Sequence, residues 1–489
     1  MMKMQSISPS PVAVIGAGPV GLAAAAHLVQ RGLPVVVLEA GDSVAAHLSS
    51  YRQVRLFSPW RYNIDRAARA LLETTGWSAP DEEHLPTAGE LVDDYLAPLA
   101  GTPALASHIQ FGSRVIAVSR DGFDKAKTAG REHADFLLQV RSDKGLREVH
   151  ARAVIDASGT WSQPNPLGVH GLPVPGEIEA RAHIVHGMPD VLGTARSRYA
   201  GRKVLVVGAG HTAAGNLLAL TTLAEQQPGT RLVWAVRGTD LRRLFGGAEN
   251  DGLPARGLLG TRLRAMVEEG QLELHLGFSI REIVPQPDGL SLFAVDADKA
   301  PIEGIDEIIA STGARPDLDI TRELRLRLDP WLESTDALAP LIDPNVHSCG
   351  TVRPHGHREL THPEPDFYAI GAKSYGRAPN FLLATGYEQA RSVVAALAGD
   401  LRAADDVQLE LPETGVCSVN LASPNLPAGN ASCCGGPAKV DTTACCSLDE
   451  LSKAQGQSGC GCGPKSTSSA TTQPEVERPR AAPSNACCG

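Results

Sequence analysis

A short apolar strand followed at once by three spaced glycines is the feature that most restricts the fold of this chain. Residues 12–15 read Val-Ala-Val-Ile, which indicates a strand buried on both faces. Gly16, Gly18 and Gly21 follow, and the alanine-rich residues 22–30 predict a helix. The first glycine permits a tight turn, the second lets backbone approach a pyrophosphate, and the third lets helix pack on strand. This order predicts a dinucleotide-binding unit.

The residue that ends the next predicted strand supports the same interpretation. Residues 34–38 are largely apolar and lead into Glu39. An acid at this position accepts hydrogen bonds from the ribose of an adenosine, and the N-terminus of the preceding helix attracts the phosphates. An ordinary strand-turn-helix unit is the structural alternative. The strand, glycines, helix, second strand and acid in this order favour nucleotide binding.

The same construction recurs near the middle of the chain. Residues 203–207 form an apolar run, and Gly208, Gly210 and Ala213 take the positions of the three glycines. Alanine is compatible with the packing role of the third position. The predicted contacts of this second unit with its nucleotide are Gly208, Gly210, His211 and Thr212.

The second unit differs from the first at the ribose position. Its next predicted strand, residues 231–236, ends in Arg237, and Arg242 and Arg243 follow closely. A guanidinium pairs with a 2'-phosphate that a carboxylate would repel, which favours NADP(H) over NAD(H). The alternative is three solvated surface arginines. Two units, one acidic and one basic, predict bound FAD and exchangeable NADPH with hydride passing between them.

Size and charge restrict the possible partners. The chain has 489 residues, 43% of them hydrophobic, and a net charge of -10. Such a chain can bury a large core, and its acidity argues against general nucleic-acid binding. Glycines interrupt the longest apolar run, residues 11–29, so no membrane span is expected. The first ten residues lack the pattern of a signal peptide, so we expect a cytoplasmic protein with small-molecule partners. Its oligomeric state is left open.

The cysteines are distributed very unevenly. Nine of the ten lie from Cys417 onward, and the body of the chain holds only Cys349. The last part is rich in Gly, Ser, Thr, Pro and Ala, and no aromatic residue follows Tyr387. Such a segment cannot bury enough apolar surface to offset its ordering entropy. We therefore predict that residues 412–489 form a disordered, cysteine-rich tail.

Paired thiolates in this tail are candidate ligands for a soft ion. Two thiolates on a flexible backbone can converge on trivalent arsenic, zinc, copper(I) or mercury(II), and the spacing does not choose among them. A low-complexity tail without a specific ligand is the alternative. The candidate thiolates are Cys433, Cys434, Cys445, Cys446, Cys460, Cys462, Cys487 and Cys488.

Three further segments resemble the two-dinucleotide-binding-domain flavoproteins over about residues 11–400. Residues 154–164 and 308–316 look like the two linker strands of that superfamily, and residues 367–371 look like the strand that returns to the flavin. The resemblance implies an α/β fold of two Rossmann-like domains in which the NADP domain is inserted into the FAD domain. The expected segments are 1–165 and 346–411 for FAD, 166–345 for NADP with linkers, and 412–489 for the tail.

Within that superfamily the chain resembles flavin-binding monooxygenases. The resemblance is carried by residues 55–60, 85–90 and 374–379, and the cysteine-paired tail makes the chain similar to those of bacterial arsenic-resistance operons. It implies oxidation of trivalent arsenicals, arsenite or methylarsenite, to pentavalent forms by O2 through a C4a-peroxyflavin. The implied FAD contacts, beyond the glycines and Glu39, are Trp60, Val115, Ser158, Gly159, Gly371, Asn380 and Phe381.

The chain departs from that family at two places. The usual Gly-Asp of the returning strand is Gly371-Ala372, which removes a carboxylate that commonly contacts FAD. The aromatic, glycine and histidine that mark flavin monooxygenases are only loosely echoed by residues 183–187. The second departure weakens the expectation of ordinary amine or sulfide substrates.

The distribution of polar residues leaves the catalytic side chains unassigned. No Cys-x-x-Cys lies beside either glycine unit, so a dithiol relay lacks its central pair and the flavin itself is expected to carry the chemistry. His347, Cys349, His355, His357 and His362 suggest a metal site, although local hydrogen bonding is the favoured interpretation.

Two rival functions stay open. The first is an NADPH-dependent flavin reductase that passes electrons to the tail thiols or to a thiol-bound metal, in the manner of mercuric reductase. The second is a flavin monooxygenase of an amine or a sulfide with a metal-scavenging tail. In the favoured interpretation, the tail captures the thiophilic substrate and delivers it to the flavin.

Overall fold

A computed structural model describes residues 10–239, 254–345 and 352–409. The tail cysteines, Cys349, His347, Arg242 and Arg243 lie outside these ranges, so the predictions that concern them are not addressed by the structure. Among the helices that it describes, none is both long and apolar enough to span a membrane.

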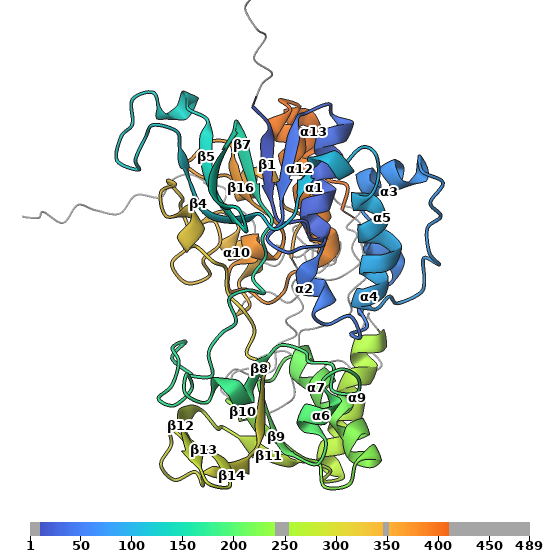
Figure 1. The fold of residues 1–489 in the computed structure, drawn as a ribbon, viewed down its shortest axis with the longest axis vertical. Helices are drawn as coiled ribbons and strands as arrows, with labels where there is room; N and C mark the ends of the chain where they lie inside the picture. Colours follow the sequence, from blue (N-terminus) through green and yellow to red (C-terminus); the bar gives the residue numbers. More distant parts are fainter. Residues whose placement is uncertain (1–9, 240–253, 346–351, 410–489) are drawn as a thin grey trace, which may run out of the picture. The chain divides into compact units, whose positions relative to one another are not determined.

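The first sheet has five parallel strands in the order β16-β7-β1-β2-β3. Figure 1 shows strands from distant parts of the sequence side by side, with β16 from near the end of the described chain next to β7. The strands are β1 Val12–Ile15, β2 Val35–Leu38, β3 Ile109–Gln110, β7 Ala153–Asp156 and β16 Phe367–Ala369. The β1 residues are at most 5% exposed, as the uninterrupted apolar run predicts.

The first glycine unit packs its helix very closely on its turn. Helix α1, Pro19–Gln30, has alanines that are fully buried against the sheet and against α12, Leu383–Leu397. A Cβ atom added at Gly21 would lie 2.0 Å from the carbonyl oxygen of Gly16. Only glycine fits this contact, which explains the third glycine of the pattern.

The second sheet has five parallel strands in the order β11-β10-β9-β15-β8. They are β8 Ile184–His186, β9 Lys203–Val207, β10 Arg231–Val236, β11 Glu273–Leu276 and β15 Glu307–Ala310. Its helices include α6 Arg196–Tyr199, α7 His211–Gln226 and α9 Pro254–Glu268. An antiparallel sheet of β12 Ile280–Gln286, β13 Gly289–Ala294 and β14 Ile302–Ile305 follows β11 in the chain.

Short elements complete the part of the chain with the first sheet. The helices are α2 Ala46–Ser49, α3 Arg66–Glu73, α4 Ala88–Glu90, α5 Ala97–Ala100, α10 Ala339–Ile342, α11 His357–Leu360 and α13 Leu401–Asp405. A π-helical turn covers Leu91–Leu96, and a 3-10 helix, η8, covers Gly371–Tyr375. A three-stranded antiparallel sheet consists of β4 Arg114–Arg120, β5 Phe136–Ser142 and β6 Gly145–Ala151.

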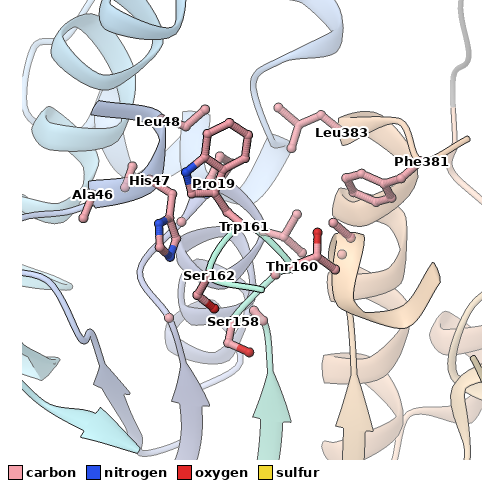
Figure 2. A pocket seen from close by; sticks show the side chains of 18 of the residues that line it. Pro19, Ala46, His47, Leu48, Ser158, Thr160, Trp161, Ser162, Phe381 and Leu383 are labelled. Atoms are coloured by element: carbon pink, nitrogen blue, oxygen red, sulfur yellow. The ribbon is translucent and has the colours of Figure 1, made fainter. Parts of the chain in front are cut away.

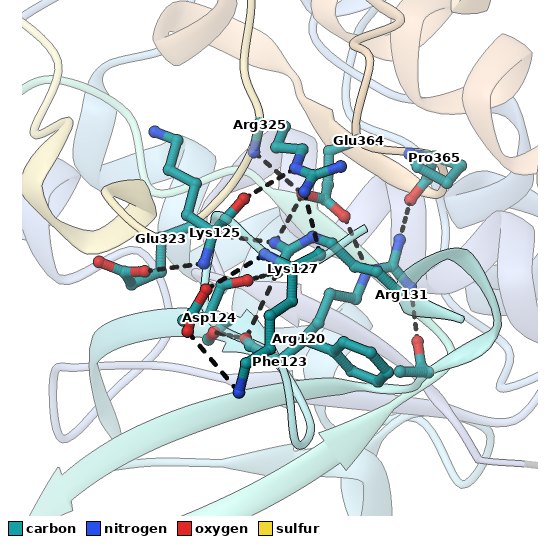
Figure 3. Close-up of polar contacts among 12 residues, drawn as sticks. Arg120, Phe123, Asp124, Lys125, Lys127, Arg131, Glu323, Arg325, Glu364 and Pro365 are labelled. Atoms are coloured by element: carbon teal, nitrogen blue, oxygen red, sulfur yellow. Dashed lines mark hydrogen bonds and ion pairs between the residues drawn. The ribbon is translucent and has the colours of Figure 1, made fainter. Parts of the chain in front are cut away.

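A buried ion network ties β4 to the segment before β16. Arg120 Nε and Arg131 Nη2 each donate to Glu364 at 2.9 Å, and all three side chains are at most 3% exposed. Figure 3 shows both guanidinium groups turned toward the Glu364 carboxylate. Burial alone would raise the pKa of Glu364, but hydrogen bonds from Arg131, the Arg325 backbone and Arg120 outweigh it and lower that pKa. The network fixes β4 against the first sheet.

The predicted fold class, an α/β chain with two dinucleotide-binding sheets, is confirmed. In the sequence, the strands of the second sheet lie between β7 and β16 of the first sheet. The first helix begins at Pro19, three residues before the predicted start, because proline is well accommodated at the first helical position. Residues 308–310, predicted as a linker strand, lie within the second sheet between β9 and β8. The segment boundaries at 165, 345 and 411 stay predictions.

Candidate nucleotide and substrate site

A cavity of about 630 Å³ opens at the carboxyl ends of β1, β2 and β7. Ligands of open parallel sheets bind at this edge, and the volume is within the usual range for small-molecule sites. The cavity wall includes many of the predicted contacts, namely Gly16, Gly18, Glu39, Val115, Ser158, Gly159, His211, Gly371 and Phe381. Figure 2 shows side chains of the wall reaching inward from several segments.

The N-terminus of α1 forms one end of this wall. Gly18 is the N-cap residue in extended conformation, and no side chain caps the first turn. A Cβ atom at Gly18 would find nothing within 4 Å, so the space beside its backbone is open. Uncapped N–H groups at a helix N-terminus attract anions, and this end of the cavity therefore fits a pyrophosphate.

Glu39 is held in place by the backbone. Its Oε2 atom accepts from the Ala17 N–H at 2.6 Å, its Oε1 atom accepts from the Gly41 N–H at 2.7 Å, and the residue is 8% exposed. Each carboxylate oxygen has a second lone pair. The side chain is therefore oriented to accept ribose hydroxyls at the rim of β2, as the sequence predicts for the adenosine of FAD.

A buried ion pair lies behind another part of the wall. Lys373 Nζ lies 3.0 Å from Asp156 Oδ2, and the two side chains are 3% and 0% exposed. The same ammonium donates to Ser158 Oγ at 3.1 Å and to the Asp317 carbonyl at 2.7 Å. The contact with Asp156 is an ion pair, and the two hydrogen bonds hold the wall residues Ser158 and Asp317. Lys373 directly follows Ala372, the position at which the resemblance leads to the expectation of an Asp.

The second glycine unit has a different setting. Gly208 has φ +132°, and a Cβ atom there would lie 2.3 Å from the Ser311 carbonyl oxygen. Gly210 is the N-cap residue of α7, without a side-chain cap, and has open space beside it. Ala213 is fully buried, so this helix leaves room for one methyl group. Arg237 is exposed at the end of β10.

Several predicted contacts do not lie on the cavity wall. Trp60 is 1% exposed and belongs to the core, and the Asn380 amide donates to the Ile342 carbonyl at 3.2 Å. Gly21 packs inside α1, as described above. In the second unit Gly208, Gly210, Thr212 and Arg237 are also off this wall, and only His211 reaches it. The roles of these residues in nucleotide binding stay predictions.

The histidines of residues 352–363 are engaged separately. The Nε2 atom of His355 lies 2.9 Å from Gln389 Nε2, that of His357 lies 2.9 Å from Asp405 Oδ1, and His362 Nδ1 accepts from the Arg327 N–H at 3.3 Å. Burial, which outweighs the Arg327 hydrogen bond, lowers the pKa of His362 to about 4. No group of three potential metal ligands occurs among the described side chains.

The structure adds wall residues that sequence reasoning missed. Tyr51 and Trp161 both line the cavity and their rings are 4.7 Å apart. Burial raises the pKa of Tyr51 to about 12, so its hydroxyl stays protonated. His47 also lines the cavity, and burial lowers its pKa more than Glu39 raises it. Tyr51 and Trp161 lie in turns and His47 lies in the short helix α2, and only the fold brings these segments together.

The chemistry of this site fits the two expected cofactors. The first unit offers an uncapped helix N-terminus, an oriented acid and an adjoining cavity, which suit FAD. The second offers an uncapped helix N-terminus and a nearby guanidinium, which suit NADP(H). When bound, FAD supplies electron transfer from NADPH, and the protein supplies binding and orientation. Fold and site together define a flavoprotein oxidoreductase with two dinucleotide-binding sheets.

Comparison with known proteins agrees with this class. Residues 13–349 match the family described as pyridine nucleotide-disulphide oxidoreductase, which covers more than half of the chain, and the chain belongs to that family. One curated relative is indole-3-pyruvate monooxygenase YUCCA1 of Oryza sativa subsp. japonica, 31% identical over 204 residues. The match spans 41% of this chain and 42% of that relative, less than half of each.

Two solved structures share the fold. Bacillithiol disulfide reductase Bdr (YpdA) from Bacillus cereus has a TM-score of 0.60 and 18% identity, and the match covers 80% of this chain and 99% of that one. DfoA, the cadaverine monooxygenase of desferrioxamine biosynthesis from Erwinia amylovora, has a TM-score of 0.57 and 13% identity over 87% and 100% of the two chains. At such identities the likeness concerns the fold alone. The predicted enzyme class, an NADPH-dependent flavin oxidoreductase, and the cofactors FAD and NADP(H) are confirmed.

Proposed function

We propose that this protein is an FAD- and NADPH-dependent monooxygenase that oxidises trivalent arsenicals, arsenite or methylarsenite, to pentavalent forms. One observation carries the oxygenase part. The cavity wall beside the N-terminus of α1 contains no cysteine among its described residues, and the whole chain has a single cysteine before residue 417. A dithiol that would take electrons from the flavin is therefore lacking on this wall, which favours O2 as the acceptor.

The proposed reaction balances with the expected cofactors. NADPH supplies two electrons, one atom of O2 joins the lone pair of the substrate atom, and the other atom leaves as water with two protons. The protein binds the nucleotides, orients the substrate and excludes bulk water. Trivalent arsenic suits this reaction because it has a lone pair, and because it is thiophilic until it is oxidised.

The arsenic part of the proposal rests on the tail and on the resemblance. The eight paired or closely spaced cysteines lie in residues 410–489, outside the described ranges. In the proposal their thiolates capture the trivalent substrate and release the harder pentavalent product. A cytoplasmic location, where such thiols stay reduced, is part of the same proposal.

The test is NADPH oxidation in air by the FAD-loaded full chain, with and without arsenite or methylarsenite. Hydrogen peroxide and the arsenic oxidation state are followed together. We expect stimulated turnover, pentavalent product and little peroxide. The matched control is the full chain with its nine tail cysteines replaced by serine, for which we expect weaker turnover at low arsenical and recovery at high arsenical.

Two outcomes would contradict the proposal. Turnover that ignores arsenicals and yields only peroxide would remove the substrate assignment and leave the flavin enzyme standing. NADPH oxidation that requires a disulfide or mercury(II) and proceeds without O2 would show a reductase instead.

A further inference from the structure

The cavity has two chemically different parts. Near the N-terminus of α1 the wall includes backbone and polar groups of Gly16, Gly18, Glu39 and Ser113, beside the apolar Pro19. The other part is aromatic and aliphatic, and its residues are Leu48, Tyr51, Phe57, Trp161, Phe381 and Leu383. We call Tyr51 and Trp161 the aromatic corner. Figure 2 shows the side chains of Trp161 and Leu48 in one part of the view, and those of Leu383 and Phe381, from one segment of the chain, to their right.

The aromatic corner is built by close packing. The Tyr51 and Trp161 rings meet at 4.7 Å between centroids with an interplanar angle of 46°. A Cβ atom at Gly187, which has φ +87°, would lie 2.8 Å from Trp161 Cη2, so the indole fills the space that this glycine leaves. Trp161 nevertheless remains 37% exposed. A large indole held from two sides and still open to a cavity is suited to contact a ligand.

The second aromatic pair on this wall has a similar character. Phe57 and His211 lie 5.4 Å apart in an edge arrangement, and both line the cavity. His211 is also the first residue of α7, so the cavity continues to the second glycine unit. This part of the wall therefore offers ring faces and edges in place of charges.

Few charged groups line the cavity, and the basic one is Arg114, which lies close enough to His47 to contribute to its lowered pKa. The acidic wall residues are Glu39, with both oxygens engaged by backbone N–H groups, and Asp317, whose Oδ1 atom accepts from the Asp319 N–H at 3.0 Å. Burial lowers the pKa of His47, which keeps that side chain neutral at pH 7. An ammonium substrate would lose its hydration against Tyr51 and Trp161, and neither side chain offers a charge in return.

We propose that the aromatic corner is a substrate subsite that selects an uncharged molecule with an aryl or other apolar group beside its lone-pair atom. The Tyr51 hydroxyl donates a hydrogen bond to the substrate's polar end, and the Trp161 indole packs on its apolar group. This inference rests on the proposed function and refines it. Among trivalent arsenicals, which are uncharged at neutral pH, it ranks phenylarsenite above methylarsenite and methylarsenite above arsenite.

The test uses the FAD-loaded full chain and five probes: phenylarsenite, methylarsenite, arsenite, thioanisole and dimethyl sulfide. We expect the KM to rise from phenylarsenite to methylarsenite to arsenite, and the KM for thioanisole to be lower than that for dimethyl sulfide. Trp161→Leu, which keeps an apolar side chain, should raise the KM for the two aryl probes about ten- to hundredfold. The KM for arsenite, which has no apolar group for the indole, should rise much less than the KM for the aryl probes, and the KM for NADPH and the FAD content are measured alongside.

Two further variants keep the test decisive. Tyr51→Phe removes only the hydroxyl and should raise the KM of all three arsenicals by a similar factor while the preference for aryl groups remains. Trp331→Leu is the matched control, because Trp331 is 83% exposed and does not line the cavity. It should change none of these values.

Several results would overturn the subsite. Loss of FAD or a changed flavin spectrum in Trp161→Leu would assign the aromatic corner to the cofactor. Equal KM changes for all probes, or preferred turnover of a diamine such as cadaverine, would remove the proposed selectivity. If no arsenical is oxidised, but thioanisole has a lower KM than dimethyl sulfide and this difference depends on Trp161, the arsenical function fails and the subsite stands.

Discussion

The two glycine units share the spacing of their residues but differ in how tightly they are packed. In the first unit, Gly21 lies so close to Gly16 that no methyl group fits, and two backbone hydrogen bonds hold Glu39 beside the cavity. In the second, Ala213 takes the third position and Arg237 is exposed. The comparison teaches that one motif can serve two purposes. The tighter unit suits a retained FAD, and the open unit suits an NADPH that must leave after each turnover.

The largest expected effect concerns the buried ion network of Glu364 with Arg120 and Arg131, beside the first sheet. Glu364→Gln removes the buried carboxylate from two buried arginines, and we expect a loss of about 3–5 kcal/mol in the free energy of unfolding. The matched change in the second sheet is Glu307→Gln, because Glu307 pairs with the partly exposed Arg198 and should cost about 1 kcal/mol or less. Urea unfolding of both variants measures the difference. Equal losses would show that burial does not distinguish the pairs.

The same network gives a pH dependence with a defined sign. Because the pKa of Glu364 is lowered in the folded state, its contribution to stability is present above its unfolded pKa and is lost as pH falls through the folded pKa. The acid loss of stability should therefore be smaller in Glu364→Gln than in the parent chain. Identical acid slopes for the two proteins would contradict this account.

The second effect tests the tightness of the two glycine units directly. Gly21→Ala places a Cβ atom 2.0 Å from a backbone oxygen, and we expect a loss of about 3 kcal/mol, at the upper end for overpacking, with loss of bound FAD. The reverse change in the second unit, Ala213→Gly, should cost only about 1 kcal/mol. Thermal unfolding and flavin absorbance measure both. A mild Gly21→Ala would mean that the first unit is not the tighter one.

The third effect separates the two nucleotides. Gly18→Ala and Gly210→Ala each add a methyl group to open space, so both variants should fold. Gly18→Ala should weaken FAD retention about tenfold, which corresponds to ~1.4 kcal/mol, and Gly210→Ala should raise the KM for NADPH by a similar factor. Equilibrium FAD titration and steady-state kinetics give the two numbers. If Gly18→Ala raised the KM for NADPH and Gly210→Ala weakened FAD retention, the assignment of the two units would be reversed.

The smallest expected effect is on nucleotide choice. Arg237→Ala should lower kcat/KM for NADPH about tenfold and leave that for NADH nearly unchanged, because only NADPH has a 2'-phosphate for the guanidinium. Arg281→Ala, at an exposed arginine paired with Glu282, is the matched control. If NADPH and NADH decline together, Arg237 acts on a feature that both nucleotides share.

Much of the fold could be predicted because its signals are local. The strands at residues 12–15, 203–207 and 231–236 have the predicted bounds, since uninterrupted apolar runs between glycines leave little choice. Residues 308–310 were harder to place. Their sequence predicts a buried strand equally well in either sheet, and only pairing with β9 and β8 put it in the second.

The candidate site divides in the same way. Glu39 could be predicted because an acid at the end of a strand has a known role in a known turn. The pair of Lys373 and Asp156 could not be predicted, since the two residues are far apart in sequence. Trp60 and Asn380 were predicted as flavin contacts, and the structure places both in the core next to the cavity.

By itself the sequence determined the two glycine units, their acidic and basic endings, and the order in which the chain visits them. These features depend on neighbours within a few residues, where backbone geometry and side-chain size act directly. Only the tertiary structure decided which distant segments line one cavity, among them the aromatic corner of Tyr51 and Trp161. The reason is physical: contacts between irregular segments are set by the packing of the whole core, which no short pattern encodes.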